Sequence, residues 1–269
     1  MALGINTNLA SIGAQNQLSQ SQNLSNQALE RLSSGLRINS AKDDAAGLQI
    51  ATELDSQIRG ETVAQRNAND AISMIQTAEG ALDEVVNNLQ RMRELSVQAA
   101  NGSNGADQLT AIQAELTQRS EEITRTINSA KFNGIDLLGG SATATTFQVG
   151  DGVETWDTIE VAFADMSGNN ASVDVTSDAT GAITTIDTAL DSVNAQRGVF
   201  GAAQNRMESV LNTLATSTEN ALASQSRILD ADFAAESAKL AKSNVLQQAG
   251  ISVLAQANAR PNQVLSLLQ

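Results

Sequence analysis

Apolar residues recur at alternating intervals of three and four residues through the first long stretch of the chain. This spacing is typical of a coiled-coil seam, in which two positions of every seven face a partner helix. The sequence therefore predicts one long amphipathic helix in this region. The positions that share the stripe are Ala68, Ala71, Ile75, Ala78, Leu82, Val85, Leu89, Met92, Ser96 and Ala99.

A second stripe of the same kind lies far down the chain. Its members recur every seven residues, and Leu190 and Leu211 fill the complementary position in two turns. Because an apolar stripe must be buried against a partner, we expect the two long helices to pack together in one antiparallel bundle. The series is Ile186, Val193, Phe200, Met207, Leu214, Ala221 and Ile228.

The residues between the stripes begin with a break in the helical pattern. The run Asn101-Gly102-Ser103-Asn104-Gly105 is rich in residues that favour turns. A shorter helical pattern follows, so the sequence predicts a helical hairpin. Its apolar members are Leu109, Ile112, Leu116, Ile123 and Ile127.

Glycines punctuate the next segment, where short runs alternate between apolar and polar residues. The clearest runs are residues 146–149 and 158–163, and such alternation is typical of β-strands. We therefore expect a small β-rich insertion over residues 139–180. Trp156, the single tryptophan, is expected to pack there beside Phe147 or Phe163.

Both ends of the chain carry few large apolar residues and many Gln, Asn, Ser and Ala. Helices with such thin stripes bury too little surface to offset an ordering cost of about 1–2 kcal/mol per residue, so we expect them to need partners. A loop follows the first end, and Ser40 or Asp43 is the expected N-cap of the next helix. The larger apolar residues at the ends include Leu3, Leu9, Leu18 and Leu32, then Leu246, Val253 and Leu254.

Composition excludes most catalytic chemistry. The chain has no His, no Cys and no Tyr, so the usual general base, the thiol nucleophile and the commonest zinc ligands are missing. The acidic pairs Asp43-Asp44 and Glu121-Glu122 are adjacent, and adjacent residues do not share a helix face. We therefore expect a structural protein with no enzyme activity, no cofactor and no metal site.

The net charge of the chain limits which binding partners it can have. Acidic residues number 30 against 16 basic ones, a formal net charge of -14, which disfavours binding to nucleic acid or to an anionic membrane surface. No run of about 18 apolar residues exists to span a bilayer, so we expect no membrane insertion. The start MALGIN lacks the features of a secretory signal, and we expect any export to proceed without a cleavable signal peptide.

Three segments of the chain resemble those of bacterial flagellin, the subunit of the flagellar filament. The first is LSSGLRINSAKDDAAG at residues 32–47, and GAAQNR at residues 201–206 is the second. The third runs from VLQQAG at 245–250 through SVLAQAN at 252–258 to VLSLL at 264–268. They occur in the family's order, which makes the resemblance highly specific.

The resemblance implies a mainly α fold: a long antiparallel helical bundle or coiled coil formed by N- and C-terminal segments, with the small β-rich insertion. Residues 1–44 and 225–269 are expected to form an inner terminal-helix domain, and residues 45–224 a helical bundle domain. Large outer domains are expected to be absent. Filament inner-tube packing is expected from Leu3, Leu9, Leu18, Leu32, Leu246, Val253, Leu254, Leu265 and Leu268.

The resemblance also implies partners. The main one is the chain itself, in a helical homopolymer outside the cell. An export chaperone, a filament cap protein and hook-junction proteins are expected by resemblance, together with flagellar type III export. The segments LQRMREL at 89–95 and QAE at 113–115 resemble those contacted by the flagellin-sensing Toll-like receptor of animals, with Arg91, Leu95 and Glu115 as the expected contact residues.

Two other classes of function stay open beside this one. A glycan-binding protein on a similar scaffold would need a concave insertion that bears aromatic residues, whereas this insertion is short and has one tryptophan. A hydrolase would need a titratable constellation, which the missing His and Cys disfavour.

Overall fold

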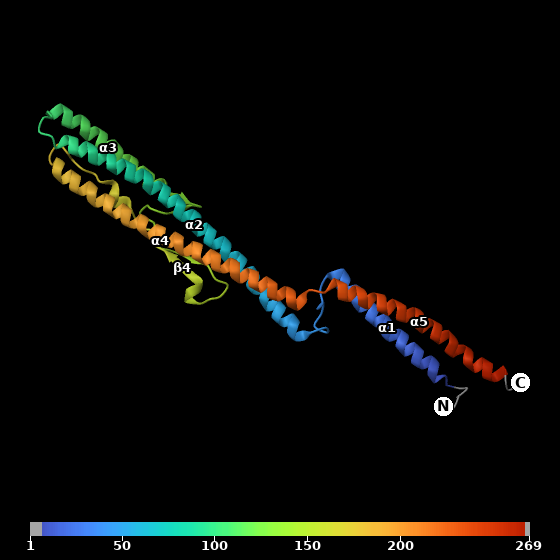
Figure 1. The fold of residues 1–269 in the computed structure, drawn as a ribbon. Coiled ribbons are helices and arrows are strands. Elements are labelled where there is room, and N and C mark those ends of the chain that lie inside the picture. Colours follow the sequence, from blue (N-terminus) through green and yellow to red (C-terminus); the bar gives the residue numbers. More distant parts are fainter. Residues whose placement is uncertain (1–6, 267–269) are drawn as a thin grey trace. The chain divides into compact units, whose positions relative to one another are not determined.

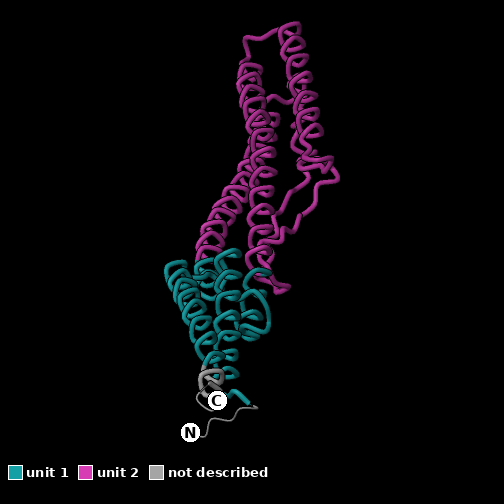
Figure 2. The backbone as a smooth tube through the Cα atoms, turned by 90° about the vertical axis from the view of Figure 1, so that its right-hand side faces the viewer, with its two compact units in different colours: residues 1–56, 220–269 teal, residues 57–219 magenta. Residues whose placement is uncertain are grey.

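The structure, a computed structural model, describes the backbone of residues 7–266 and the side chains of residues 7–259. Its described part consists of long α-helices with short strands and 3₁₀ turns between two of them (Figure 1). The chain divides into two compact units, Met1–Ser56 with Asn220–Gln269 (unit 1) and Gln57–Glu219 (unit 2), which Figure 2 shows in separate colours. The boundaries expected at 44/45 and 224/225 stay a prediction.

Unit 2 is built around α3 (Ala106–Ser129) and around those parts of α2 (Ala45–Ala99) and α4 (Ala179–Leu229) that lie within residues 57–219, and Figure 1 shows the three helices side by side. The first predicted stripe is buried along α2, from Ala68 through Ala99. On α4 the series from Ile186 to Ala221 is buried as well, and Ile228 is half-buried. The mainly α fold and the long apolar seams are therefore confirmed.

Polar contacts show that α2 and α4 run antiparallel. Near one end of unit 2 the Glu61 carboxylate accepts hydrogen bonds from Ser217 Oγ (2.6 Å) and Thr218 Oγ1 (2.7 Å). Toward the other end, Arg93 Nε donates to Asp187 Oδ1 (2.6 Å). Residue numbers rise along one helix as they fall along the other.

Two small antiparallel hairpins lie between α3 and α4, the first just before the expected insertion at 139–180 and the second within it. In the first, β1 (Lys131–Phe132) pairs with β2 (Ile135–Asp136) around Asn133 and Gly134, whose φ angles of 49° and 82° suit a tight hairpin turn. In the second, β3 (Thr145–Gln148) pairs with β4 (Thr158–Val161). The 3₁₀ turns η1 (Thr155–Asp157) and η2 (Ser167–Asn170) complete the segment.

Two local predictions are wrong. Trp156 does not pack beside Phe147 or Phe163, because its side chain is 75% exposed; Phe163 instead packs against Phe200, with ring centroids 5.4 Å apart. The N-cap of α2 is neither Ser40 nor Asp43. It is Asp44, whose Oδ1 accepts from the Gly47 backbone N–H (3.0 Å), because Asp44 directly precedes the first helical residue.

Candidate functional site

The terminal helices α1 (Leu9–Ser34) and α5 (Phe233–Ser266) pair antiparallel within unit 1 (Figure 1). At one end of the pair, Asn8 Nδ2 donates to the Ala257 carbonyl (2.8 Å). At the other end, Arg31 Nη1 lies 3.2 Å from Glu236 Oε1. Helices from opposite ends of the sequence therefore form one two-stranded element.

The residues that face each other in this pair follow a heptad spacing that the sequence pattern did not reveal. Their intervals alternate between three and four residues on both helices, as in a coiled coil. Most of the occupants are small or polar, so no hydrophobic stripe marks the seam. The buried and half-buried seam residues are Ser11, Ala14, Leu18, Ser21, Ser25, Ala28 and Leu32 on α1, and Glu236, Leu240, Ser243, Gln247, Gly250, Leu254 and Ala257 on α5.

Small side chains allow two helices to approach closely, but they bury little apolar area. Ser21 and Ala28 are each 1% exposed, so the two most deeply buried described positions on α1 contribute a hydroxymethyl and a methyl group rather than long aliphatic chains. Gly250 lies opposite Leu18, because a Cβ added to this glycine would be 3.6 Å from Leu18 Cδ1. The seam is thus tightly packed and weakly hydrophobic.

The larger apolar side chains of the pair lie mostly off the seam. Leu9 is 77% exposed and Val245 65% exposed, and both protrude from the pair rather than into it. Other exposed apolar residues in these two helices are Ile12, Leu24, Leu29, Phe233, Leu246, Ile251 and Val253.

The residues expected to pack the inner tube fall into two groups. Leu18, Leu32 and Leu254 are half-buried in the seam, whereas Leu9, Leu246 and Val253 are exposed. Leu3 and Leu268 lie outside the described residues, and Leu265 lies in α5 beyond the described side chains.

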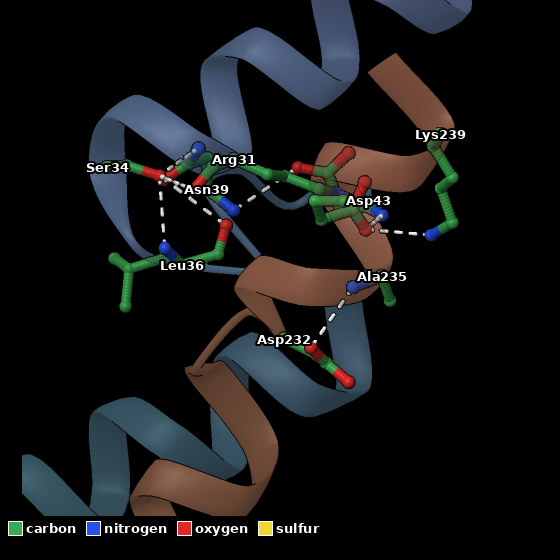
Figure 3. A network of polar contacts seen from close by, with 9 residues as sticks. Arg31, Ser34, Leu36, Asn39, Asp43, Asp232, Ala235 and Lys239 are labelled. Carbon is green, nitrogen blue, oxygen red and sulfur yellow. Dashed lines mark hydrogen bonds and ion pairs between the residues drawn. The ribbon is translucent and has the colours of Figure 1, made fainter. Parts of the chain in front are cut away.

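A buried ion pair crosses the seam near the loop that follows α1. The Glu236 carboxylate is buried and accepts from Lys239 Nζ (2.7 Å) as well as from Arg31 Nη1 (3.2 Å). Lys239, and then Arg31, hold the pKa of Glu236 below its ordinary value, against the opposing effect of burial. Figure 3 shows Arg31 and Lys239 in this network.

The loop after α1 is fixed by its own hydrogen bonds. Gly35 ends α1 in a left-handed conformation (φ 74°), which glycine adopts at little cost. Ser34 Oγ accepts from the Leu36 backbone N–H (3.1 Å) and from Asn39 Nδ2 (2.8 Å), as Figure 3 shows. The Asp43 carboxylate accepts from the Asn39 and Ser40 backbones, which lower its pKa.

Contacts from this loop also reach the junction of α4 and α5. Arg37 Nη2 donates to the Ile228 carbonyl (2.7 Å), and Leu36 forms an isolated antiparallel bridge with Asp230. Asp232 Oδ1 accepts from the Ala234 (2.9 Å) and Ala235 (3.1 Å) backbones at the start of α5 (Figure 3). The sequence motif at residues 32–47 thus positions the terminal pair.

The residues expected at a receptor surface lie in unit 2. Arg91 on α2 is exposed and lies 2.9 Å from Glu94 and 3.5 Å from Glu115 on α3, so the structure brings Arg91 and Glu115 together. Leu95 is only 3% exposed and packs in the bundle core. Its expected direct contact stays a prediction.

The described part of the chain contains neither a cluster of metal-ligating side chains nor a helix that could span a membrane. Among residues 7–259, no cluster of three or more metal-ligating side chains is present. None of the described helices is long and apolar enough to cross a bilayer.

The N-terminal and C-terminal parts of the chain each match a model of a known protein family. Residues 5–143 match the model of the bacterial flagellin N-terminal helical region. Residues 183–268 match the model of the bacterial flagellin C-terminal helical region. The two matches together include α1, α2, α3 and α5, and α4 from residue 183 onward.

Individual relatives align over the whole length. A flagellin from Xenorhabdus nematophila is 42% identical, covering 100% of both chains, and one from Halalkalibacterium halodurans is 42% identical, covering 98% of this chain and 99% of the relative. Polar flagellin F of Vibrio parahaemolyticus is 34% identical over 100% of both chains.

Solved structures agree in fold. The crystal structure of Bacillus cereus flagellin superposes with a TM-score of 0.51 at 30% identity, covering 55% of this chain and 88% of that one. A flagellar hook-associated protein of Vibrio parahaemolyticus gives a TM-score of 0.60 over 70% of this chain and 100% of that one, but at 15% identity it shows the fold alone. The chain therefore belongs to the bacterial flagellin family, and it is a structural subunit of the extracellular flagellar filament rather than an enzyme.

Proposed function

We propose that the chain polymerises through the outward faces of α1 and α5, and that these two helices complete their hydrophobic burial on neighbouring copies. The observation that carries the proposal is the division of side chains in the terminal pair. Small and polar residues occupy most positions of the seam within the chain, while Leu9, Val245 and Val253 are exposed.

Burial against a neighbour would supply what the seam lacks. Each Å² of apolar surface removed from water stabilises by roughly 25 cal/mol, and the part of a leucine or valine side chain that is exposed contributes nothing of this in a lone chain. Ordering of the two helices is then coupled to binding. Repeated contacts between unlike faces that do not close into a ring generate a helical filament.

The test changes side chains on the outward faces of α1 and α5 and leaves the rest of the molecule unchanged. A chain carrying Leu9→Gln and Val245→Gln is expected to lose filament formation in sedimentation and electron microscopy, while its circular dichroism retains the signal of the unit 2 bundle. A chain carrying Val97→Gln, an exposed valine of α2 in unit 2, is the matched control. Normal filaments from the double variant would contradict the proposal, as would normal filaments after deletion of residues 1–40 or 230–269.

We also propose an export route for the chain and binding partners other than the chain itself. We infer that the chain leaves the cell through the flagellar type III route without a cleavable signal peptide, with a chaperone on its C-terminal segment and with cap and hook-junction proteins at the filament ends. Exposed apolar residues on α5 support the chaperone, because an unshielded apolar helix would otherwise associate prematurely. Deletion of residues 230–269 should abolish chaperone binding in a titration; undiminished binding would contradict this assignment.

A second candidate function is recognition of the monomer by the animal flagellin receptor. The observation that favours it is the pair of the exposed Arg91 on α2 and the half-buried Glu115 on α3, held 3.5 Å apart on one surface of the bundle. Leu95 packs beneath this surface, so it would support the position of Arg91.

Receptor-stimulation assays with monomer test this role. Arg91→Ala should reduce potency about tenfold or more, because a charge-assisted contact at a hot spot is worth at least about 1.4 kcal/mol. Arg125→Ala is the control, since Arg125 forms a similar exposed ion pair with Glu122 on α3. Equal potency of the two variants would reject the assignment.

A further inference from the structure

Asparagine is followed directly by glycine at several places in the chain. Such an asparagine is prone to lose its side-chain amide without any enzyme, because glycine has no Cβ to shield its backbone nitrogen or to restrict the backbone. The fold places these pairs in different surroundings, so their hydrogen bonds and backbone conformations decide which pair reacts first. The pairs are Asn101-Gly102, Asn104-Gly105 and Asn133-Gly134.

The first pair lies in the turn that joins α2 to α3, at one end of the bundle (Figure 1). Asn101, Gly102 and Ser103 are exposed, and a Cβ added to Gly102 would have no neighbour within 4 Å. The Asn104 backbone N–H donates to the Asn101 carbonyl (3.1 Å), which makes Gly102 and Ser103 the central residues of a β-turn. Among residues 7–259 the Gly102 N–H has no hydrogen-bond acceptor, so its nitrogen is open to solvent and free to react.

The Asn101 side chain is oriented for attack by one hydrogen bond. The Ser103 backbone N–H donates to Asn101 Oδ1 (3.3 Å). A donor at this oxygen stabilises the negative charge that develops there when a nucleophile adds to Cγ. The turn therefore places a free backbone nitrogen next to a polarised side-chain carbonyl.

The second pair is held in place from both sides. Asn104 Nδ2 donates to the Gln98 carbonyl (2.6 Å), which directs the side chain toward the end of α2. Gly105 precedes α3, and its carbonyl accepts from the Leu109 N–H (3.1 Å) in the first turn of that helix. Attack by the Gly105 nitrogen on Asn104 Cγ would break the bond to Gln98 and disturb the start of α3.

The third pair is exposed but fixed by its hairpin. Asn133 and Gly134 form the turn between β1 and β2, with φ angles of 49° and 82°. The strands pair on both sides of this turn, and Lys131 Nζ lies 2.9 Å from Asp136 Oδ1 across the hairpin. Rotation of the peptide between Asn133 and Gly134 toward the side chain would break this pairing.

We infer that Asn101 is a modification site of the chain, and that it deamidates spontaneously ahead of Asn104 and Asn133. Water or hydroxide takes the Gly102 amide proton, and the Gly102 nitrogen bonds to Asn101 Cγ as negative charge moves to Oδ1. The bond between Cγ and Nδ2 then breaks, and Nδ2 takes a proton from water and leaves as ammonia. The product is a cyclic succinimide. Addition of water to one of its two carbonyls opens the ring to aspartate or isoaspartate.

The fold should tolerate the product, because the turn is exposed and makes no contact with the buried core. The new carboxylate adds one negative charge to a chain of formal net charge -14. It lies just past Ala99, the last residue of α2, where the helix dipole disfavours negative charge. The last turn of α2 should therefore loosen while the rest of the bundle stays packed. This inference does not depend on the proposed polymerisation.

Peptide mapping by mass spectrometry tests the order of reaction. The full, folded chain is incubated in mildly alkaline buffer and then digested with trypsin. Asn101 and Asn104 share the tryptic peptide between Arg93 and Arg119, so fragmentation of that peptide assigns the gain in mass to one of them. We expect Asn101 to convert severalfold faster than Asn104 and Asn133. Conversion of either of these at the same rate as Asn101, or faster, would overturn the inference.

Unfolding separates the effect of the fold from that of the dipeptide. In urea the three pairs lose their hydrogen bonds and present the same two residues to solvent, so their rates should converge. If Asn101 keeps its full advantage in urea, the turn between α2 and α3 is not the cause.

A matched variant tests the role of the Gly102 nitrogen. Gly102→Ala should slow conversion of Asn101 severalfold, because the added Cβ hinders attack, and should leave the rate at Asn133 unchanged. The variant should melt as the natural chain does, because Gly102 lies in open space and does not have a positive φ angle. An unchanged rate at Asn101 in the folded variant would contradict the proposed chemistry.

The product itself is tested with Asn101→Asp. Amide exchange should become faster in the last turn of α2 and stay slow along the buried stripe of that helix. Faster exchange along the whole stripe would show that the fold does not tolerate the modification.

Discussion

At the scale of single residues, Glu236 makes the terminal helix pair sensitive to acid. Its pKa is held below the ordinary value by Lys239 and Arg31. A carboxylate with a depressed folded-state pKa stabilises the fold above its unfolded pKa, about 4.3, and this stabilisation is lost as pH falls through the folded-state pKa. The α1–α5 pair should therefore weaken below about pH 4.

The corresponding test compares two glutamates of the terminal pair. Glu236→Gln should flatten the pH dependence of amide exchange in α1 and α5 between about pH 5 and pH 3. Glu30→Gln, which replaces an exposed carboxylate of α1, should leave that dependence as it is. If both variants retain the wild-type profile, the ion pair does not control the acid response.

Glu61 presents a different residue-scale case, because its carboxylate is buried in unit 2 and is held by the hydroxyls of Ser217 and Thr218. Removing both hydroxyls with Ser217→Ala and Thr218→Val should cost about 3 kcal/mol, since it leaves a buried charge with fewer donors. Glu61→Leu should cost less, about 1 kcal/mol, because the freed hydroxyls can bond to carbonyls of their own helix. Urea denaturation followed by circular dichroism gives both values, and the reverse order would contradict this reasoning.

At the scale of elements, the sequence predicted the seams made of large apolar residues and missed the seam made of small ones. The stripe from Ala68 to Ala99 could be identified because Ile, Leu, Val and Met occupy half of its positions and alanine most of the others. The α1–α5 seam has the same spacing, but Ser21, Ser25 and Gly250 carry no hydrophobic signal. Periodicity in hydrophobicity detects a heptad only when its occupants differ from the surface in polarity.

Local polar contacts explain the other sequence-level errors. Trp156 is exposed because the hydrogen bonds of its loop fix the loop's backbone. The general tendency of tryptophan to be buried, on which the sequence prediction rested, takes no account of such bonds. Asp44 rather than Asp43 caps α2 because of a shift of one residue in the loop, and such boundaries are poorly determined by pattern.

Gly250 gives an element-scale prediction for the terminal pair. A Cβ there would make an ordinary van der Waals contact with Leu18 Cδ1 at 3.6 Å. Gly250→Ala should therefore stabilise α5 by about 0.5–1 kcal/mol through helix propensity and reduced unfolded-state entropy. Amide exchange in monomer should slow in α5, and faster exchange would show that the seam cannot admit the methyl group.

At the scale of the whole molecule, the formal net charge of -14 means that copies repel one another as they approach. Added salt screens this repulsion, with a Debye length of about 10 Å at 0.1 M. Filament growth should therefore accelerate as salt is raised from low concentration, in a seeded assay followed by light scattering. Growth rates independent of salt would show that charge repulsion does not limit assembly.

The most direct measurement of the central claim is amide hydrogen exchange on the full chain as dilute monomer and as filament. The account predicts fast exchange along α1 and α5 in monomer and strong protection of both helices in filaments, with the seam of α2 from residue 68 to 99 protected in both states. Slow exchange of α1 and α5 already in dilute monomer would contradict it, because the terminal pair would then be stable without neighbouring copies.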